Sequence, residues 1–187
     1  MRSTTQPKQE NETESIAWTE TTTVRRVTDN ELRATIENSL RSYCRGVDRL
    51  DGPLIASGFH PGALLGDYGA QSTTIEAFVE RVIPSLRRRF VVTQHRISNI
   101  SIERRDGGAA LVETYVHATH VEATEDGRCL QTFVGRYIDR FEERDGDWKI
   151  AHRLLRVDWT NVEQMGDPMK GSFVASGRDG TPDPIWD

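Results

Sequence analysis

The side chains best suited to chemistry in this sequence are Asp48 and His95. Asp48 lies close to the apolar side of a predicted helix, where an acid costs free energy unless it has a partner. His95 lies in a segment of alternating polarity and shares a face with Ile97, Asn99 and Ser101. A carboxylate within reach of His95 would hold one imidazole nitrogen protonated and leave the other as a base near neutral pH. We therefore treat Asp48 and His95 as a candidate acid–base dyad.

Both residues also have a purely structural interpretation. Asp48 is equally consistent with an exposed acid in the last helical turn, or with a cap for the turn that follows. A single histidine on a strand is more often a structural residue than a catalytic one. The dyad interpretation therefore requires that the two side chains meet inside the protein.

Two more histidines occupy the next alternating segment and lie on opposite faces of it. His120 shares its face with small or apolar residues, including Val116 and Ala118, and such a face is the better pocket wall. We therefore predict that His120 points inward, and that Val116 and Ala118 contact a substrate. His117 shares its face with mostly polar residues and is expected at the surface or at an interface.

Two arginines in the later segments also need an explanation. An arginine on an apolar strand face requires a carboxylate or an anionic ligand group, and Arg153 shares such a face with Ala151, Leu155, Val157 and Trp159. Arg153 either contacts the substrate or forms a buried ion pair, with Asp48 as one candidate partner. Arg136 is more ambiguous, and we include it among the candidates for substrate binding.

Tyr43 precedes Asp48 on the same predicted helix. Its phenol either adds a hydrogen-bond donor to the site or packs in the core with a hydrated hydroxyl. The sequence has no glycine-rich phosphate loop after a strand, no His-Glu-x-x-His metal spacing and no nucleophile elbow around a serine. We therefore expect no metal site of this kind, and the polar residues described above remain as the candidates for chemistry.

Helical periodicity positions the first of these residues. A capping box at Thr28 and Glu31 opens a helix predicted over 29–49, with an apolar stripe at Leu32, Ile36, Leu40, Tyr43 and Val47. A short helix is predicted over 54–59 and a loop over 64–71. The next helix begins after Thr73 or Thr74 and carries Pro84, which should kink it or end its regular part. Three arginines before Phe90 are expected to form a solvated helix end.

From Phe90 onward the apolar period becomes two, which indicates strands. Asp-Gly turns separate four predicted strands, which cover 91–104, 109–123, 130–143 and 148–159. Helices followed by an antiparallel meander are typical of the α+β class. A curved, mostly antiparallel sheet that closes over the helices would form a cone-shaped α+β barrel with a pocket inside.

Composition narrows the class of protein further. The 187 residues predict one domain over 28–160, an N-terminal arm over 1–27 and an extended tail over 161–187. The net charge of -5, from 24 basic and 29 acidic residues, argues against nucleic acid or an anionic membrane as the main partner. Two cysteines without motif spacing favour a reducing cytoplasm, and neither a secretory signal nor a membrane-spanning run is expected.

Three motifs carry a family resemblance. They are Tyr-Cys-Arg-Gly-Val-Asp-Arg-Leu-Asp-Gly, Thr-Gln-His-Arg-Ile-Ser-Asn and Gly-Arg-Tyr-Ile-Asp-Arg-Phe-Glu-Glu-Arg-Asp-Gly-Asp-Trp-Lys-Ile-Ala-His-Arg. Over about residues 28–159 the chain resembles the SnoaL-like branch of the nuclear transport factor two-like superfamily. The third motif is distinctive of the branch, and the first two separate its catalytic members from its binding members.

Within that branch the chain is most similar to scytalone dehydratase, bile-acid 7-alpha-dehydratase and hexachlorocyclohexane dehydrochlorinase. The resemblance implies a cofactor-free lyase or isomerase that acts on a hydrophobic cyclic molecule. It implies that Asp48 and His95 form the catalytic dyad, assisted by Arg153, Tyr43 and His120. It also implies a homo-oligomer, with a trimer favoured.

Two alternatives share the same fold. One is a non-catalytic module that only binds a ligand or partner, since fold does not decide function. The other is a structural subunit similar to the beta chain of ring-hydroxylating dioxygenases. A filled pocket, or separation of Asp48 from His95, would favour the binding module over the enzyme. A stable homo-oligomer without an iron-sulfur partner would argue against the structural subunit.

Overall fold

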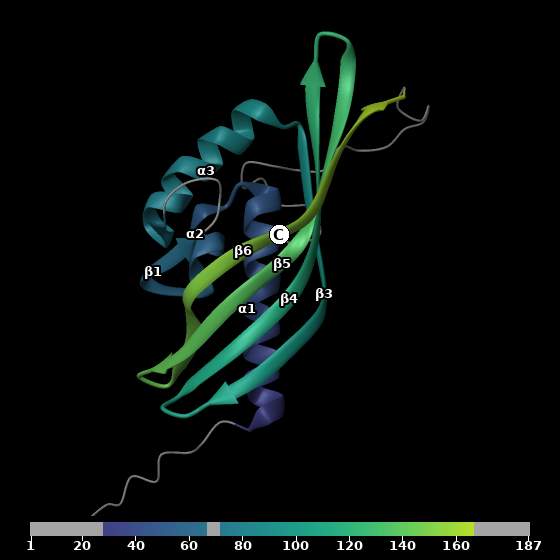
Figure 1. Ribbon diagram of the computed structural model, residues 1–187. Helices are drawn as coiled ribbons and strands as arrows, with labels where there is room; N and C mark the ends of the chain where they lie inside the picture. The colour runs from purple at the N-terminus through teal and green to yellow at the C-terminus, as the bar shows by residue number, and fades with distance from the viewer. Residues whose placement is uncertain (1–27, 67–71, 167–187) are drawn as a thin grey trace, which may run out of the picture.

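The structure is a computed structural model that describes residues 28–66 and 72–166. The predicted N-terminal arm and residues 167–187 of the predicted tail lie outside the described residues. The described ranges fold as helices packed inside a curved sheet (Figure 1). No helix in these ranges is long and apolar enough to cross a bilayer.

Helix α1 (Asp29–Arg49) starts at the predicted capping box. The Glu31 amide donates to Thr28 Oγ1 at 3.3 Å, and the Thr28 amide donates to Glu31 Oε2 at 2.9 Å. These bonds satisfy amides that the first turn leaves without helical partners. The predicted apolar stripe is buried in full. Helix α1 therefore packs one continuous apolar face against the sheet and brings Asp48 to its inner end.

The segment after α1 differs from its prediction. Helix α2 (Gly52–Ser57) is capped by Asp51, whose carboxylate accepts from the Leu54 amide at 2.9 Å. Strand β1 (Phe59–Gly66) then follows. It includes the last residue of the helix predicted over 54–59 and the first three residues of the loop predicted over 64–71. It pairs in parallel with the last strand of the sheet, which lies far away in the sequence. Such a distant partner leaves no local signal, which explains why the prediction was wrong here.

Strand β2 (Thr73–Thr74) leads into helix α3 (Ile75–Arg89), and Thr74 caps that helix by accepting from the Ala77 amide at 3.3 Å. Pro84 lies inside α3, yet the helix continues to Arg89, so Pro84 does not end it. Phe78 and Leu86 are buried on the inner face of α3. This helix closes the side of the cone that the sheet leaves open (Figure 1).

The predicted meander is confirmed. Antiparallel hairpins join β3 (Val92–Arg105), β4 (Ala109–Thr124), β5 (Gly127–Arg144) and β6 (Asp147–Met165). The full sheet has the order β2-β1-β6-β5-β4-β3. Strand β6 runs five residues past the predicted domain boundary at 160, and its last residue, Met165, pairs with Arg128. The outcome is an α+β cone fold with one mixed, mostly antiparallel sheet.

Bulges decide which residues of the strands face the interior. In β3 the register shifts between Ser98 and Ser101, and Asn99 adopts a left-handed φ of 49°. The extra residue reverses the alternation, so Ile100 and Ile102 pack against the core while Asn99 and Ser101 are exposed. The prediction that Asn99 and Ser101 share the face of His95 was therefore wrong.

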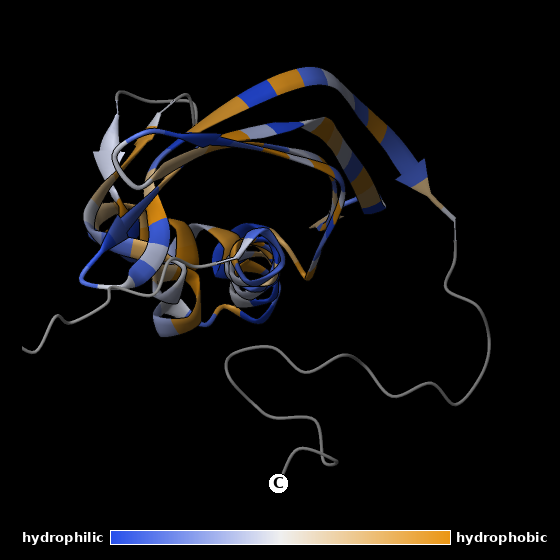
Figure 2. Ribbon diagram, turned by 90° about the horizontal axis from the view of Figure 1, so that it is seen from below, coloured by the Kyte–Doolittle hydropathy of each residue, from blue (hydrophilic) through white to orange (hydrophobic). Residues whose placement is uncertain are grey.

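A similar correction applies to β6. Register shifts occur opposite Val134–Gly135 and opposite Arg140–Phe141. They leave Arg153 fully buried, whereas Trp159 is 52% exposed and lies beside the exposed His117 on the outer face. Strict alternation had predicted that Arg153 and Trp159 share a face, and that prediction was wrong. Seen from below, the sheet arches over the helices, and its strands are striped by alternating hydropathy (Figure 2).

Candidate active site

Asp48 and His95 meet, as the dyad interpretation requires. Asp48 Oδ1 lies 2.7 Å from His95 Nδ1, and Asp48 Oδ2 accepts from the backbone amide of His95 at 3.0 Å. Both carboxylate oxygens of Asp48 are thus hydrogen-bonded to His95. The side chains of His95 and Asp48 are only 8% and 18% exposed. A carboxylate held in this way assigns the proton to Nδ1 and leaves Nε2 as the free imidazole nitrogen.

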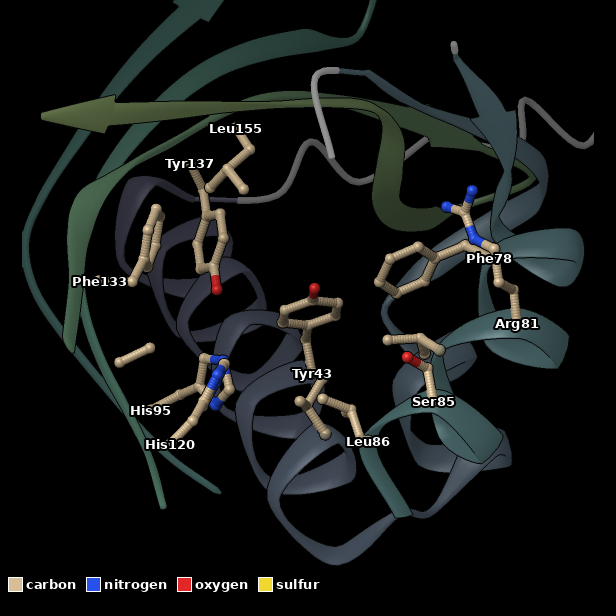
Figure 3. Close-up of a pocket in the computed structure, with 13 residues that line it drawn as sticks. Tyr43, Phe78, Arg81, Ser85, Leu86, His95, His120, Phe133, Tyr137 and Leu155 are labelled. Carbon is tan, nitrogen blue, oxygen red and sulfur yellow. The ribbon is translucent and has the colours of Figure 1, made fainter. Parts of the chain in front are cut away.

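A cavity of about 500 Å³ lies next to His95, between the sheet and the helices. Its apolar lining comes from the helices through Val47, Phe78, Val82 and Leu86, and from the sheet through Ala118, Phe133 and Leu155. Its polar lining consists of Tyr43, Arg81, Ser85, His95, His120 and Tyr137. This size and composition suit a small hydrophobic molecule held by a few polar groups. Figure 3 shows these side chains around the cavity.

His120 lines the cavity beside His95, as predicted. The two rings lie 5.4 Å apart between centroids, and the Phe90 ring packs 4.7 Å from His120. The two histidines come from adjacent strands, because Thr93 pairs with His120 in the β3–β4 ladder. His117 is exposed on the outer face, as expected.

Arg153 and Asp139 form an ion pair beneath the cavity. Arg153 Nε and Nη2 donate to the two oxygens of Asp139, each at 2.7 Å, and both side chains are 0% exposed. The guanidinium also lies 4.4 Å from the Tyr43 ring centroid and 4.1 Å from that of Tyr137. Arg153 is thus a buried ion-pair residue, but its partner is Asp139 and not Asp48. It does not line the cavity, so it contacts the site through the two tyrosines.

The two tyrosines bring hydroxyl groups to the middle of the cavity. Tyr43 and Tyr137 pack edge to face, with ring centroids 5.6 Å apart, and both hydroxyls point into the cavity (Figure 3). Burial raises the pKa of Tyr137 well above its usual value of 10.0. Tyr137 therefore stays protonated at neutral pH and remains a hydrogen-bond donor.

Sequence reasoning missed Tyr137 and Asp139. Both share the inner face of β5 with Phe133 and Phe141, an alternation that the sequence displays. The ion pair was hidden for another reason. Regular pairing from the β5–β6 turn places Asp139 opposite His152, and only the bulge moves Arg153 into register with it.

Two of the predicted substrate contacts lie elsewhere. Arg136 is on the outer face, where it donates to Glu113 at 3.0 Å and to Asp158 at 3.2 Å. These acids raise the pKa of its guanidinium. Val116 is buried in the core and does not line the cavity, whereas Ala118 does.

The remaining buried nucleophile is Cys44, on α1 beside the dyad. Burial raises the pKa of its thiol to about 12, so the thiolate is negligible at neutral pH. Within residues 28–66 and 72–166, no three His, Cys, Asp or Glu side chains cluster in a way that could hold a metal ion. Among the side chains that line the cavity, His95 is the imidazole whose Nδ1 is held by a carboxylate.

Solved structures with the same fold come from several organisms. A candidate scytalone dehydratase from Novosphingobium aromaticivorans is 22% identical, with a TM-score of 0.59 over 81% of this chain and 95% of that one. A hexachlorocyclohexane dehydrochlorinase, LinA-type3 from Novosphingobium barchaimii, is 18% identical, with a TM-score of 0.62 over 74% and 94%. A cystatin-like protein of unknown function from Nostoc punctiforme is 16% identical, with a TM-score of 0.56 over 72% and 96%. At these identities the likeness shows a shared fold.

The family assignment comes from sequence. No curated protein matches the chain. The SnoaL-like domain family matches residues 28–154, which include both members of the dyad and the buried ion pair. Since this match spans more than half of the chain, the protein belongs to the SnoaL-like family.

Proposed function

We propose that the protein is a cofactor-free lyase or isomerase that removes a proton from a carbon atom of a hydrophobic cyclic molecule. The observation that carries the proposal is the 2.7 Å contact between Asp48 and His95 at the wall of an open, mainly apolar cavity. A purely structural His–Asp pair has no need of such a cavity. Two of the similar structures are named as a dehydratase and a dehydrochlorinase, and both of these names describe elimination reactions.

His95 is the base in this proposal. Its Nε2 takes the proton, the electron pair of the broken C–H bond forms the new carbon–carbon double bond, and the leaving group departs with the electrons of its own bond. A leaving hydroxide takes the proton back from the His95 imidazolium, which restores the base, and departs as water. A halide leaves as the anion, and the imidazolium then gives its proton to solvent. In an isomerisation the proton instead returns to another carbon. Asp48 fixes the tautomer of His95 and stabilises the imidazolium that forms.

The tyrosine hydroxyls are the donors in this proposal. Tyr43 and Tyr137 point into the cavity, where either can donate to a carbonyl or to a leaving oxygen (Figure 3). His120 lies close enough to share that role. One well-placed donor in a dry site lowers the activation barrier by roughly 3 kcal/mol. Arg153 and Asp139 act as positioning residues that hold the two tyrosine rings.

A turnover screen tests the proposal. Cyclic β-hydroxy ketones and vicinal halocycloalkanes are incubated with the protein, and loss of water or hydrogen halide is followed by mass spectrometry. We expect at least one compound to be turned over, and His95→Gln to lower kcat/KM by about 10²–10⁴-fold. Arg88→Gln, an exposed change on α3, serves as the control. Unchanged turnover by His95→Gln would contradict the mechanism.

We also propose that the protein assembles as a homo-oligomer, with a trimer favoured, through the outer face of the sheet. That face exposes large apolar side chains, among them Val92 at 44%, Tyr115 at 44% and Trp159 at 52%. Exposed apolar residues gathered on one face are characteristic of protein interfaces.

A further inference from the structure

Helix α3 places two polar side chains on its otherwise apolar inner face. Arg81 and Ser85 both line the cavity, together with Phe78, Val82 and Leu86 of the same helix. Residues four apart on a helix lie one above the other on the same face, so Arg81 and Ser85 are neighbours. In Figure 3 they lie across the cavity from His95 and His120. The cavity therefore has a second polar end, away from the dyad.

Arg81 is an exposed side chain at the rim of the cavity, and Ser85 is half-buried. Within the part of the chain that the structure describes, neither the Arg81 guanidinium nor the Ser85 hydroxyl forms a hydrogen bond or ion pair. By contrast, Arg89 on the same helix donates to Glu122 and Gln131. Arg81 is the one arginine or lysine that lines the cavity in the described ranges. An unpaired guanidinium at the edge of an apolar cavity, with a hydroxyl one turn away, forms a site for an anionic oxygen group.

We infer that Arg81 and Ser85 form a subsite for a carboxylate on the substrate, at the end remote from the atom that loses its proton. A planar guanidinium binds a carboxylate through two parallel hydrogen bonds, and Ser85 can donate a third. The inference deepens the proposed function, on which it rests. It narrows the substrate class to hydrophobic cyclic acids whose carboxylate lies across the ring system from the reacting carbon.

The subsite also explains how an apolar cavity could orient its substrate. Apolar walls hold a ring by burial alone, which is not directional. An ion pair at one end fixes which carbon faces His95. Positioning of this kind contributes to rate as well as to affinity.

Binding measurements test the subsite without any turnover. Naphthalene-2-carboxylate and phenanthrene-2-carboxylate are titrated into the protein by calorimetry, each beside its uncharged carboxamide. We expect the wild-type protein to bind at least one carboxylate about tenfold or more tightly than its amide, as expected for a charge-assisted pair. Arg81→Gln should abolish that preference while leaving the amide affinity unchanged, and Ser85→Ala should reduce it. Arg88→Gln, an exposed arginine of the same helix outside the cavity, should retain it.

The inference is overturned if neither carboxylate binds more tightly than its own amide. The same holds if none of these compounds binds. So does a preference that survives in Arg81→Gln. Melting temperatures without ligand show whether each variant is folded. Repeating the titration with His95→Gln separates the two proposals, because the carboxylate preference should persist there. Suppose that the carboxylate preference is lost in Arg81→Gln and kept in His95→Gln, while turnover in His95→Gln is also unchanged. That result would support the subsite and reject the mechanism.

Discussion

At the scale of single residues, Asp139 and Arg153 show why the site depends on groups outside the cavity. Their two bonds of 2.7 Å lie in a place that water does not reach. Burial raises the pKa of Asp139 above its usual value, and the adjacent Arg153 opposes that shift. The Arg153 guanidinium also packs against the rings of Tyr43 and Tyr137, 4.4 Å and 4.1 Å from their centroids. Loss of one partner should therefore damage both the fold and the site.

Asp139→Asn leaves the buried Arg153 charge without compensation. We expect it to lower the free energy of unfolding by about 3–5 kcal/mol, measured by urea denaturation. The double variant Asp139→Leu with Arg153→Met should recover most of this loss, since it removes both charges. As a control, Arg41→Met breaks an exposed pair with Glu37 on α1 and should cost less than about 1 kcal/mol. Equal losses in the buried and exposed variants would refute the stabilising role of the pair.

Cys44 gives a second prediction at this scale. Cys44 is 6% exposed as a residue, and the raised pKa of its thiol, about 12, keeps the thiol protonated at pH 8. Iodoacetamide, which reacts with the thiolate, should therefore modify only the half-buried Cys129 of the native protein. Peptide mapping should find both cysteines modified after denaturation. Labelling of native Cys44 at a rate similar to that of Cys129 would show that α1 opens readily.

At the scale of elements, the sequence predicted what periodicity controls and missed what bulges control. The two long helices and the four meander strands follow from apolar spacing and turn residues, whereas the pairing of Asp48 with His95 was expected from the family resemblance. Apolar spacing does not predict on which face of the sheet Asn99, Ser101 and Trp159 lie, because one extra residue in the strand reverses the alternation. The partner of Arg153 was missed for the same reason. Strand β1 was missed because its parallel partner lies far away in the sequence.

Gly135 tests one of these bulges. A Cβ added at Gly135 would lie 2.0 Å from the carbonyl oxygen of Arg156, which belongs to the neighbouring strand β6. Gly135→Ala should therefore force β5 and β6 apart and lower the free energy of unfolding by about 3 kcal/mol, measured in urea. Gly166→Ala provides the control, because a Cβ there meets nothing within 4 Å. A Gly135→Ala protein as stable as the control would mean that the bulge relaxes easily.

At the scale of the whole molecule, the sheet separates two surfaces. Its inner face surrounds the cavity, and its outer face carries His117, Trp159 and the proposed interface between copies. Trp159→Glu would place a charge in that interface. We expect light scattering to show the wild-type protein as a trimer and the variant as smaller species, with the fold retained by circular dichroism. A monomeric wild-type protein would contradict the proposed assembly and leave the cavity unaffected.

In the proposed mechanism, Asp48 and His95 act together as one base. A double-mutant cycle on a confirmed substrate tests it most directly, using kcat/KM for Asp48→Asn, His95→Gln and the two combined. If the two residues work as one unit, each single change should lower kcat/KM by about 10²-fold or more. The double variant should then be no worse than His95→Gln alone. Losses that multiply in the double variant, or a single variant with wild-type turnover, would contradict this mechanism.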